Sequence, residues 1–216
     1  QEIVSHLSRY KLRSKIEIND FSSKYVIGVI SLDKFKEIQT GEKKNTETII
    51  YRESPLFIDP RTKELGARIL STVEKLHLTI KKLGLKIIDT KSYLIKAHEN
   101  GIPIKGIKNL KNQLFGLEAN FEELKGIDFQ KGCYVGQENT ARMKLKEKLR
   151  RRLLAIKTDE KLKIGSELIF DNVKIGKILI SEPYPFALIK LFDPNFSKFK
   201  DKEILIENKK IKIINK

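Results

Sequence analysis

Residues 167–176, Glu-Leu-Ile-Phe-Asp-Asn-Val-Lys-Ile-Gly, contain two apolar runs separated by the turn signal Asp171-Asn172. Two short apolar runs joined in this way are typical of a β-hairpin. Further short apolar runs lie on both sides of the hairpin, at 152–156, 186–192, 203–206 and 210–214. A close succession of short strands favours a small closed sheet over a helical domain. We therefore predict an antiparallel β-barrel over 149–216.

The chain before residue 149 has a mixed pattern of helices and strands. Apolar residues at helical spacing predict helices at 2–10 and 90–99, and capping-box spacing between Asn120 and Glu123 predicts a short third helix ending at Gly126. Alternating or continuous apolar runs predict strands at 15–18, 25–30, 48–51 and 56–58. The polar stretch 36–47 is expected to be a mobile loop.

The clearest helical signal in this part of the sequence lies between Asp59 and Gly84. Asp59 can cap a helix, Pro60 suits its first position, and Gly84 is a typical terminator. Apolar residues recur between them at spacings of four and three, which predicts one helix with a single buried face. These residues are Leu65, Ile69, Val73, Leu76, Ile80 and Leu83.

Length and composition exclude several classes of protein. The 216 residues are 40% hydrophobic and 33% charged, which suits one or two folded domains and is unlike a disordered chain. No apolar run is long enough to span a membrane, and the single cysteine excludes an internal disulfide and a paired-cysteine metal site. We expect no membrane partner, no metal site and a cytoplasmic location. Because the sequence begins with Gln1 and its one methionine is Met143, we also expect the natural start to lie upstream.

The formal net charge of +16 has two interpretations. A lysine-rich surface can be merely solvated, or it can attract RNA or another polyanion over long range. A basic RNA-binding module is therefore one candidate function. Aromatic side chains do not alternate with the basic residues along any strand, as they do in modules that stack bases.

The segment 129–138, Phe-Gln-Lys-Gly-Cys-Tyr-Val-Gly-Gln-Glu, contains the lone cysteine, Cys133. Gly132 and Gly136 permit a tight turn or the close approach of a ligand, or they only shape a turn. The ammonium group of Lys131 would favour the thiolate of Cys133, which is the nucleophilic and metal-binding form. The chemistry of the residues alone leaves a second interpretation open, in which Cys133 is a small buried hydrophobic residue.

The pattern Lys131-Gly132-Cys133-Tyr134-x-Gly136-Gln137-Glu138 resembles the signature of the YgfZ-type folate-binding proteins, relatives of the aminomethyltransferase (T-protein) of the glycine cleavage system. Weaker matches follow in the expected order along the chain. They are 9–18, Asp59-Pro60-Arg61, Leu65-Gly66-Ala67-Arg68, Gly101-Ile102-Pro103, Leu117-Glu118-Ala119-Asn120, Ala141-Arg142 and 150–153. The resemblance implies an α+β fold. A partial, N-terminally truncated folate-binding region of ferredoxin-like pieces at 1–148 would precede the barrel.

The resemblance also implies tetrahydrofolate as cofactor. Glu99 would hold the pterin, because a carboxylate can accept two parallel hydrogen bonds from an aminopyrimidine edge, and Arg142 would bind the glutamate tail. Read without the resemblance, Glu99 is a solvated charge at a helix end and Arg142 a surface arginine. The sequence departs from the family at Ala97-His98-Glu99, where Arg-Ile-Glu is usual, and at Gly116, where proline is usual. We expect His98 to be a surface or boundary residue.

The function implied by the resemblance is support of iron–sulfur cluster assembly or repair in client enzymes, including tRNA-modifying ones. Cys133 would be the functional thiol, and the partners would be iron–sulfur client proteins, with an indirect link to tRNA and a monomeric protein. The alternative is a folate-dependent aminomethyltransferase or methyltransferase. Whether the protein catalyses a reaction stays open at this point.

Overall fold

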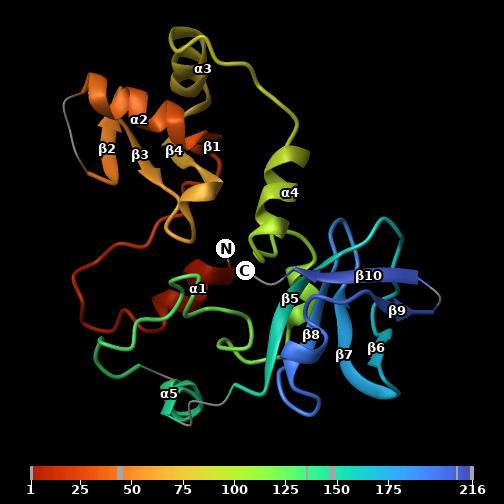
Figure 1. Ribbon diagram of the computed structural model, residues 1–216. Helices are drawn as coiled ribbons and strands as arrows, with labels where there is room; N and C mark the ends of the chain where they lie inside the picture. The colour runs from red at the N-terminus through yellow and green to blue at the C-terminus, as the bar shows by residue number, and fades with distance from the viewer. Residues whose placement is uncertain (1, 43–45, 135, 146–148, 208, 215–216) are drawn as a thin grey trace. The chain divides into compact units, whose positions relative to one another are not determined.

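The computed structural model describes residues 2–42, 46–134, 136–145, 149–207 and 209–214. The chain divides into two compact units, each with its own core (Figure 1). The first unit comprises residues up to 59 together with 66–87, and the second comprises 60–65 and 88–216.

The first unit is a four-stranded antiparallel sheet with helices packed on one face. The strand order is β1-β4-β3-β2. Phe35 and Ile38 of α2 pack with Leu56 and Ile69 of the sheet, and Leu76 of α3 joins the same core. The elements in chain order are α1 (Glu2–Ser8), β1 (Val26–Ile30), α2 (Leu32–Gly41), β2 (Thr48–Tyr51), β3 (Ser54–Ile58), β4 (Ala67–Ser71) and α3 (Val73–Lys82).

The single helix predicted between Asp59 and Gly84 is wrong. Residues 67–71 form β4, the inner strand that pairs with β1 and β3, and the α-helix covers only 73–82. Gly66 explains the break, because its φ of +76° is a left-handed conformation that ends a helix. Thr72 then caps α3, with its hydroxyl oxygen accepting a hydrogen bond from the Lys75 amide. Spacings of three and four had joined a strand and a helix into one apparent stripe.

Three further local predictions are also wrong. Residues 36–41 of the expected loop belong to α2, which the Ser31 side chain caps and which buries two apolar residues against the sheet, while 43–45 lie outside the described residues. The stretch 15–18 forms no strand. Residues 120–126 form turns rather than a helix, because Asn120 has a φ of +61° and its side-chain amide donates to the Leu153 carbonyl instead of capping.

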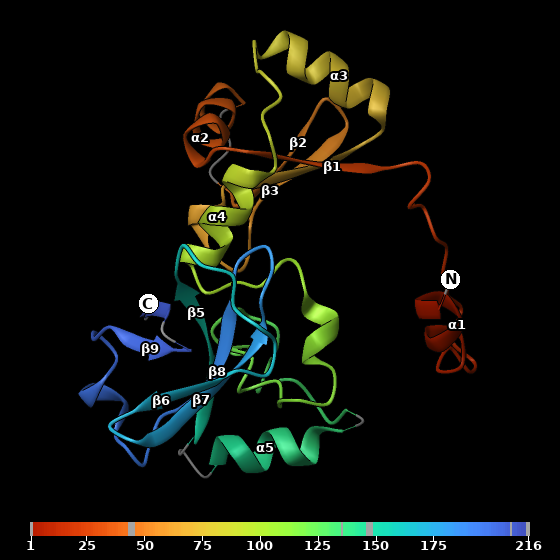
Figure 2. The same cartoon turned by 90° about the vertical axis from the view of Figure 1, so that its right-hand side faces the viewer.

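The second unit contains the predicted barrel, and the α+β fold class is thereby confirmed. Six antiparallel strands follow the order β6-β7-β8-β5-β10-β9, and the edge strands β6 and β9 lie beside each other, so the sheet nearly closes (Figure 2). The strands are β5 (Arg151–Lys157), β6 (Glu167–Phe170), β7 (Val173–Ile180), β8 (Phe186–Lys190), β9 (Ile204–Ile206) and β10 (Lys209–Ile214). The Asp171-Asn172 hairpin forms as expected, with both turn residues at positive φ.

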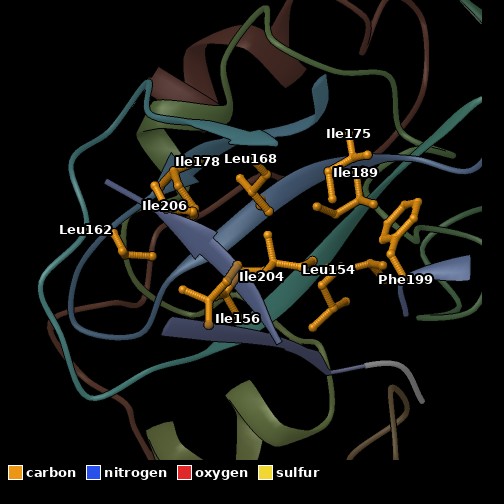
Figure 3. Close-up of a cluster of buried hydrophobic side chains, with 13 residues drawn as sticks. Leu154, Ile156, Leu162, Leu168, Ile175, Ile178, Ile189, Phe199, Ile204 and Ile206 are labelled. Carbon is orange, nitrogen blue, oxygen red and sulfur yellow. The ribbon is translucent and has the colours of Figure 1, made fainter. Parts of the chain in front are cut away.

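The barrel interior is filled by aliphatic side chains that alternate with outward residues along the strands. Figure 3 shows these side chains pointing toward one another, with Phe199 at one end of the cluster and Leu162 at the other. Burying a Leu, Ile or Phe side chain contributes about 1.5 to 3 kcal/mol each, so this cluster is the main source of stability in the unit. Fully buried members include Ile156, Leu168, Ile175, Ile178, Ile189 and Phe199.

The rest of the second unit consists of helices and turns outside the sheet of the barrel. It contains α4 (Lys91–Glu99), α5 (Gln137–Leu145) and three 3₁₀ turns, η1 (Lys63–Leu65), η2 (Ile107–Leu110) and η3 (Phe196–Lys198). Leu110 and Leu114 cover an outer face of β5, so β5 is buried on both sides. None of the helices in the described part of the chain is long and apolar enough to cross a membrane. The predicted domain boundary at 148/149 lies inside this unit and stays a prediction.

Replacing Gly66 with alanine should strongly destabilise the protein. A Cβ there would lie 2.1 Å from the carbonyl oxygen of Ile30, in addition to the unfavourable φ. We expect a loss of more than about 3 kcal/mol in the free energy of unfolding, measured by urea denaturation. Gly84→Ala is the matched control, because Gly84 also has a positive φ, +59°, but open space around it. Equal losses in the two variants would contradict the proposed clash.

Candidate functional site

The segment that carries Cys133 is a compact turn held by its own side chains. The Tyr134 amide donates to the side-chain oxygen of Gln137 at 3.1 Å, and the Gln137 amide donates to the Tyr134 carbonyl at 3.2 Å. Lys131 places its ammonium group 4.5 Å from the centre of the Tyr134 ring, a cation–π contact. Gly136 has a φ of +85°, which only glycine adopts readily. The motif residues therefore shape the turn that leads into α5.

Cys133 is exposed on this turn. The alternative of a buried core cysteine is thus wrong, and the thiol can reach another molecule. Gly132 and Glu138 are exposed as well, and Val135 lies outside the described residues. α5 buries none of its side chains, and Arg142 is exposed on it. The roles of the motif residues and of Arg142 stay predictions.

A buried carboxylate fixes the chain just before this segment to the barrel. Glu118 is 4% exposed, and Arg151 at the start of β5 donates to it through Nε at 2.8 Å and Nη2 at 3.2 Å. The Phe115 amide donates to the same carboxylate, at 3.0 Å. The Glu118 carbonyl accepts from the Leu153 amide at 2.7 Å. The stretch 117–120, noted above only as a family resemblance, therefore has a structural task.

A second pair of residues from the family-like stretches, Asp59 and Arg68, forms an ion pair within the first unit. Asp59 is 2% exposed, and both Nε and Nη2 of Arg68 lie 2.9 Å from its Oδ2. The Asp59 amide also donates to the Gly66 carbonyl at 2.9 Å. In the second unit, Arg61 donates to the Tyr93 hydroxyl at 2.9 Å. Arg68 is thus the ion-pair partner of a buried carboxylate.

Glu99 is the last residue of α4, and its side chain is exposed. A carboxylate in this position is available to accept hydrogen bonds from a ligand. Within the part of the chain that the structure describes, no hydrogen bond or ion pair joins Glu99 to the Cys133 turn. The two predicted site residues thus belong to separate local structures.

The neighbouring His98 is the residue that sequence reasoning misjudged. It is buried, at 7% exposed, and its Nε2 lies 3.0 Å from the Pro185 carbonyl oxygen. The rings of Tyr184 and Phe186 lie 5.3 and 5.1 Å away, centre to centre. Burial lowers the pKa of His98 from its ordinary value of 6.5, against smaller opposing effects of the Pro185 carbonyl, Glu99 and Ile156. The signal in the sequence was Leu94 four residues earlier, on the same helical face.

A small hollow next to His98 is lined by α4, residues 102–105 and the loop before β8. Its volume of about 10 Å³ suits roughly one water molecule, whereas sites for drug-sized ligands measure about 300 to 1,000 Å³. The hollow does not fit folate, so a pterin held by Glu99 would need other walls. Among the described residues, no group of three or more His, Cys, Asp or Glu side chains could hold a metal ion.

The chain is similar to proteins named iron–sulfur cluster assembly factors. It is 30% identical over 183 residues to the mitochondrial IBA57 homologue of Dictyostelium discoideum, covering 82% of this chain and 44% of that protein. It is 32% identical over 156 residues to the mitochondrial IBA57 of Mus musculus, covering 71% of this chain and 41% of that protein. The chain thus spans less than half the length of these relatives. No family model matches it.

A solved structure also matches the chain. It is the glycine cleavage system aminomethyltransferase T from Bartonella henselae, with 12% identity, a TM-score of 0.39, and coverage of 83% of this chain and 55% of that one. The sequence matches above confirm the resemblance to YgfZ-type proteins, of which this chain is a relative. More particularly, its named relatives are the IBA57 assembly factors.

The predicted cytoplasmic location is wrong by the same comparisons. The named relatives, including those of Dictyostelium discoideum, Mus musculus and Homo sapiens, are all mitochondrial proteins.

Replacing Arg151 with methionine should destabilise the second unit. The change leaves the Glu118 carboxylate buried without its guanidinium partner, which costs about 2 to 3 kcal/mol even though Arg151 is partly exposed. Urea denaturation followed by circular dichroism measures the loss. Lys174→Met is the control, because its partner Glu167 is half exposed and surface pairs contribute at most about 1 kcal/mol. A smaller loss of stability for Arg151→Met than for the control would show that the ion pair between Glu118 and Arg151 does not stabilise the unit.

Proposed function

We propose that this protein supports the assembly or repair of iron–sulfur clusters in client enzymes, with Cys133 as the functional thiol. The observation that carries the proposal is the exposure of Cys133 on a turn that Lys131, Tyr134 and Gln137 hold in shape. The names of the relatives support the same role, since they describe assembly factors. Among possible clients we include enzymes that modify tRNA, as the family resemblance implies.

Cys133 would act by transient ligation, because a resident iron–sulfur cluster normally needs about four protein ligands and this chain has one cysteine. The thiol loses its proton, and its sulfur bonds to a cluster iron as the bond from that iron to a donor protein's thiolate breaks. The released thiolate takes up the proton, so no electrons change hands. Exposure permits this ligand exchange, since the cluster must approach within bonding distance.

Replacing Cys133 with alanine should abolish this function without unfolding the protein. The side chain is exposed and its replacement leaves no cavity, so we expect stability to change by less than about 0.5 kcal/mol. In cells that lack the gene, the Cys133→Ala variant should fail to restore the activity of iron–sulfur enzymes that the wild-type gene restores. Gln130→Ala is the control, because Gln130 is exposed on the same segment and offers no sulfur.

Two results would overturn the proposal. Full rescue by Cys133→Ala would show that the thiol is dispensable. Efficient transfer of an aminomethyl group from a lipoyl carrier to tetrahydrofolate by the purified protein would favour the transferase alternative. Alkylation of Cys133 by iodoacetamide in the folded protein checks that the thiol is accessible in solution.

We propose tetrahydrofolate as the ligand of the Glu99 region. The support is the exposed carboxylate at the end of α4, which can accept paired hydrogen bonds from an aminopyrimidine. The chain's own residues would bind and orient the ligand; we assign no step of cluster assembly to it.

Glu99→Ala should weaken tetrahydrofolate binding. Losing a charged, paired hydrogen bond costs about 1.5 to 3 kcal/mol, or roughly a tenfold to hundredfold loss of affinity, measurable by calorimetric titration. Glu123→Ala is a suitable control, because Glu123 is also exposed but pairs with Arg152. Equal affinities of wild type and Glu99→Ala would remove Glu99 from the site.

A further inference from the structure

His98 differs from the other two histidines of the chain in being enclosed. His6 and His77 are exposed on α1 and α3, whereas the His98 ring lies against Tyr184 and edge-on to Phe186. Burying a polar ring costs free energy unless its nitrogens find hydrogen-bond partners. The partner of Nε2 is a backbone carbonyl of the loop between β7 and β8.

That carbonyl, of Pro185, accepts two hydrogen bonds. One comes from the Ile156 amide of β5 at 2.9 Å, and the other involves His98 Nε2 at 3.0 Å. Because a carbonyl oxygen only accepts, Nε2 must carry the proton. A single atom of the barrel therefore holds both a barrel strand and the end of α4.

Backbone hydrogen bonds close the end of α4 next to His98. The Gly101 amide donates to the His98 carbonyl at 2.9 Å, the Ile102 amide donates to the Ala97 carbonyl at 2.9 Å, and Gly101 adopts a φ of +68°. This arrangement is a Schellman-type helix end. Glu99 lies within it, so the position of the Glu99 backbone follows that of His98.

The charged and titratable groups around the ring give a protonated imidazole little support. Glu99 is its neighbour on α4, Lys105 lines the hollow from 102–105, and Tyr184 faces it from the loop before β8. Glu182 of the same loop is exposed and pairs with Lys161. The Glu99 carboxylate is exposed to solvent, and the hollow is otherwise lined by apolar side chains, Lys105 and Tyr184.

We propose that His98 is a positioning residue whose uncharged imidazole ties the Glu99 end of α4 to the barrel, and that protonation releases this tie in acid. A charged ring would be buried among aromatic and aliphatic walls, so it would leave its place or pull the loop open. The expected effect on ligand binding at Glu99 rests on the proposed folate site. The tie between His98 and the Pro185 carbonyl does not depend on that site.

The direction of the pH dependence follows from the burial of the ring. Burial lowers the pKa of His98 in the folded protein below its ordinary value of 6.5. Between the lowered folded-state pKa and pH 6.5, the unfolded protein therefore binds more protons than the folded protein, and stability rises with pH. The contribution of His98 is present above pH 6.5 and is lost as the pH falls from there through the lowered folded-state pKa.

The test compares wild type with His98→Gln, which keeps an N–H donor but does not titrate. Urea denaturation and amide hydrogen exchange at Gly101 and Ile102 are measured between about pH 5 and 8, with tetrahydrofolate titrations at the same pH values. In wild type we expect stability, protection and affinity to fall together in acid, with a several-fold loss of affinity. His98→Gln should flatten these profiles, and His77→Gln should retain the wild-type profiles.

The outcomes separate this proposal from the proposed folate site. If no variant binds tetrahydrofolate, the stability and hydrogen-exchange profiles still decide whether the tie exists. If His98→Gln does not fold, nuclear magnetic resonance titration of the wild-type imidazole decides. An imidazole pKa at or above 6.5, or an unchanged acid profile in His98→Gln, would overturn the proposal.

Discussion

The ion pair between Glu118 and Arg151 connects the two kinds of structure in the second unit. Arg151 begins β5, an inner strand of the barrel that pairs with β8 on one side and β10 on the other. A buried carboxylate is costly unless its lone pairs are used, and here a guanidinium and a backbone amide use them. The irregular chain before Cys133 is therefore held to the regular sheet at Glu118.

This attachment explains how an exposed thiol can have a defined setting. The stretch 115–120, which carries Glu118, comes shortly before the Cys133 turn, and β5 begins soon after α5. The turn itself depends on short-range contacts among Lys131, Tyr134 and Gln137 rather than on a hydrophobic core. A thiol that must meet a cluster on another protein benefits from such a display, because a core position would shield it.

Within one short stretch of α4, neighbouring residues have opposite environments. His98 is buried against the loop before β8 and Glu99 faces solvent, as adjacent positions of a helix point about 100° apart. The buried residue sets the geometry and the exposed one is free to meet a ligand. A substitution at His98 can therefore change what happens at Glu99 without touching the ligand.

The local sequence pattern was sufficient to predict secondary structure wherever neighbouring residues decide it. The Asp171-Asn172 hairpin, the strand runs of the barrel and the helix at 91–99 all follow from turn chemistry and periodicity. The resemblance at 131–138 likewise marked the segment that displays Cys133. These features depend on contacts within a few residues, which the order of side chains states directly.

Tertiary structure decided the features that depend on distant partners. The apparent helical stripe from Leu65 to Leu83 is interrupted, because Gly66 lies against the Ile30 carbonyl and β4 pairs with β1 and β3. Asn120 caps no helix; its side-chain amide donates a hydrogen bond to the Leu153 carbonyl, 33 residues away. His98 is buried because a proline carbonyl 87 residues later accepts its proton-bearing nitrogen. A sequence states which groups need partners, but only the folded chain determines which partners they find.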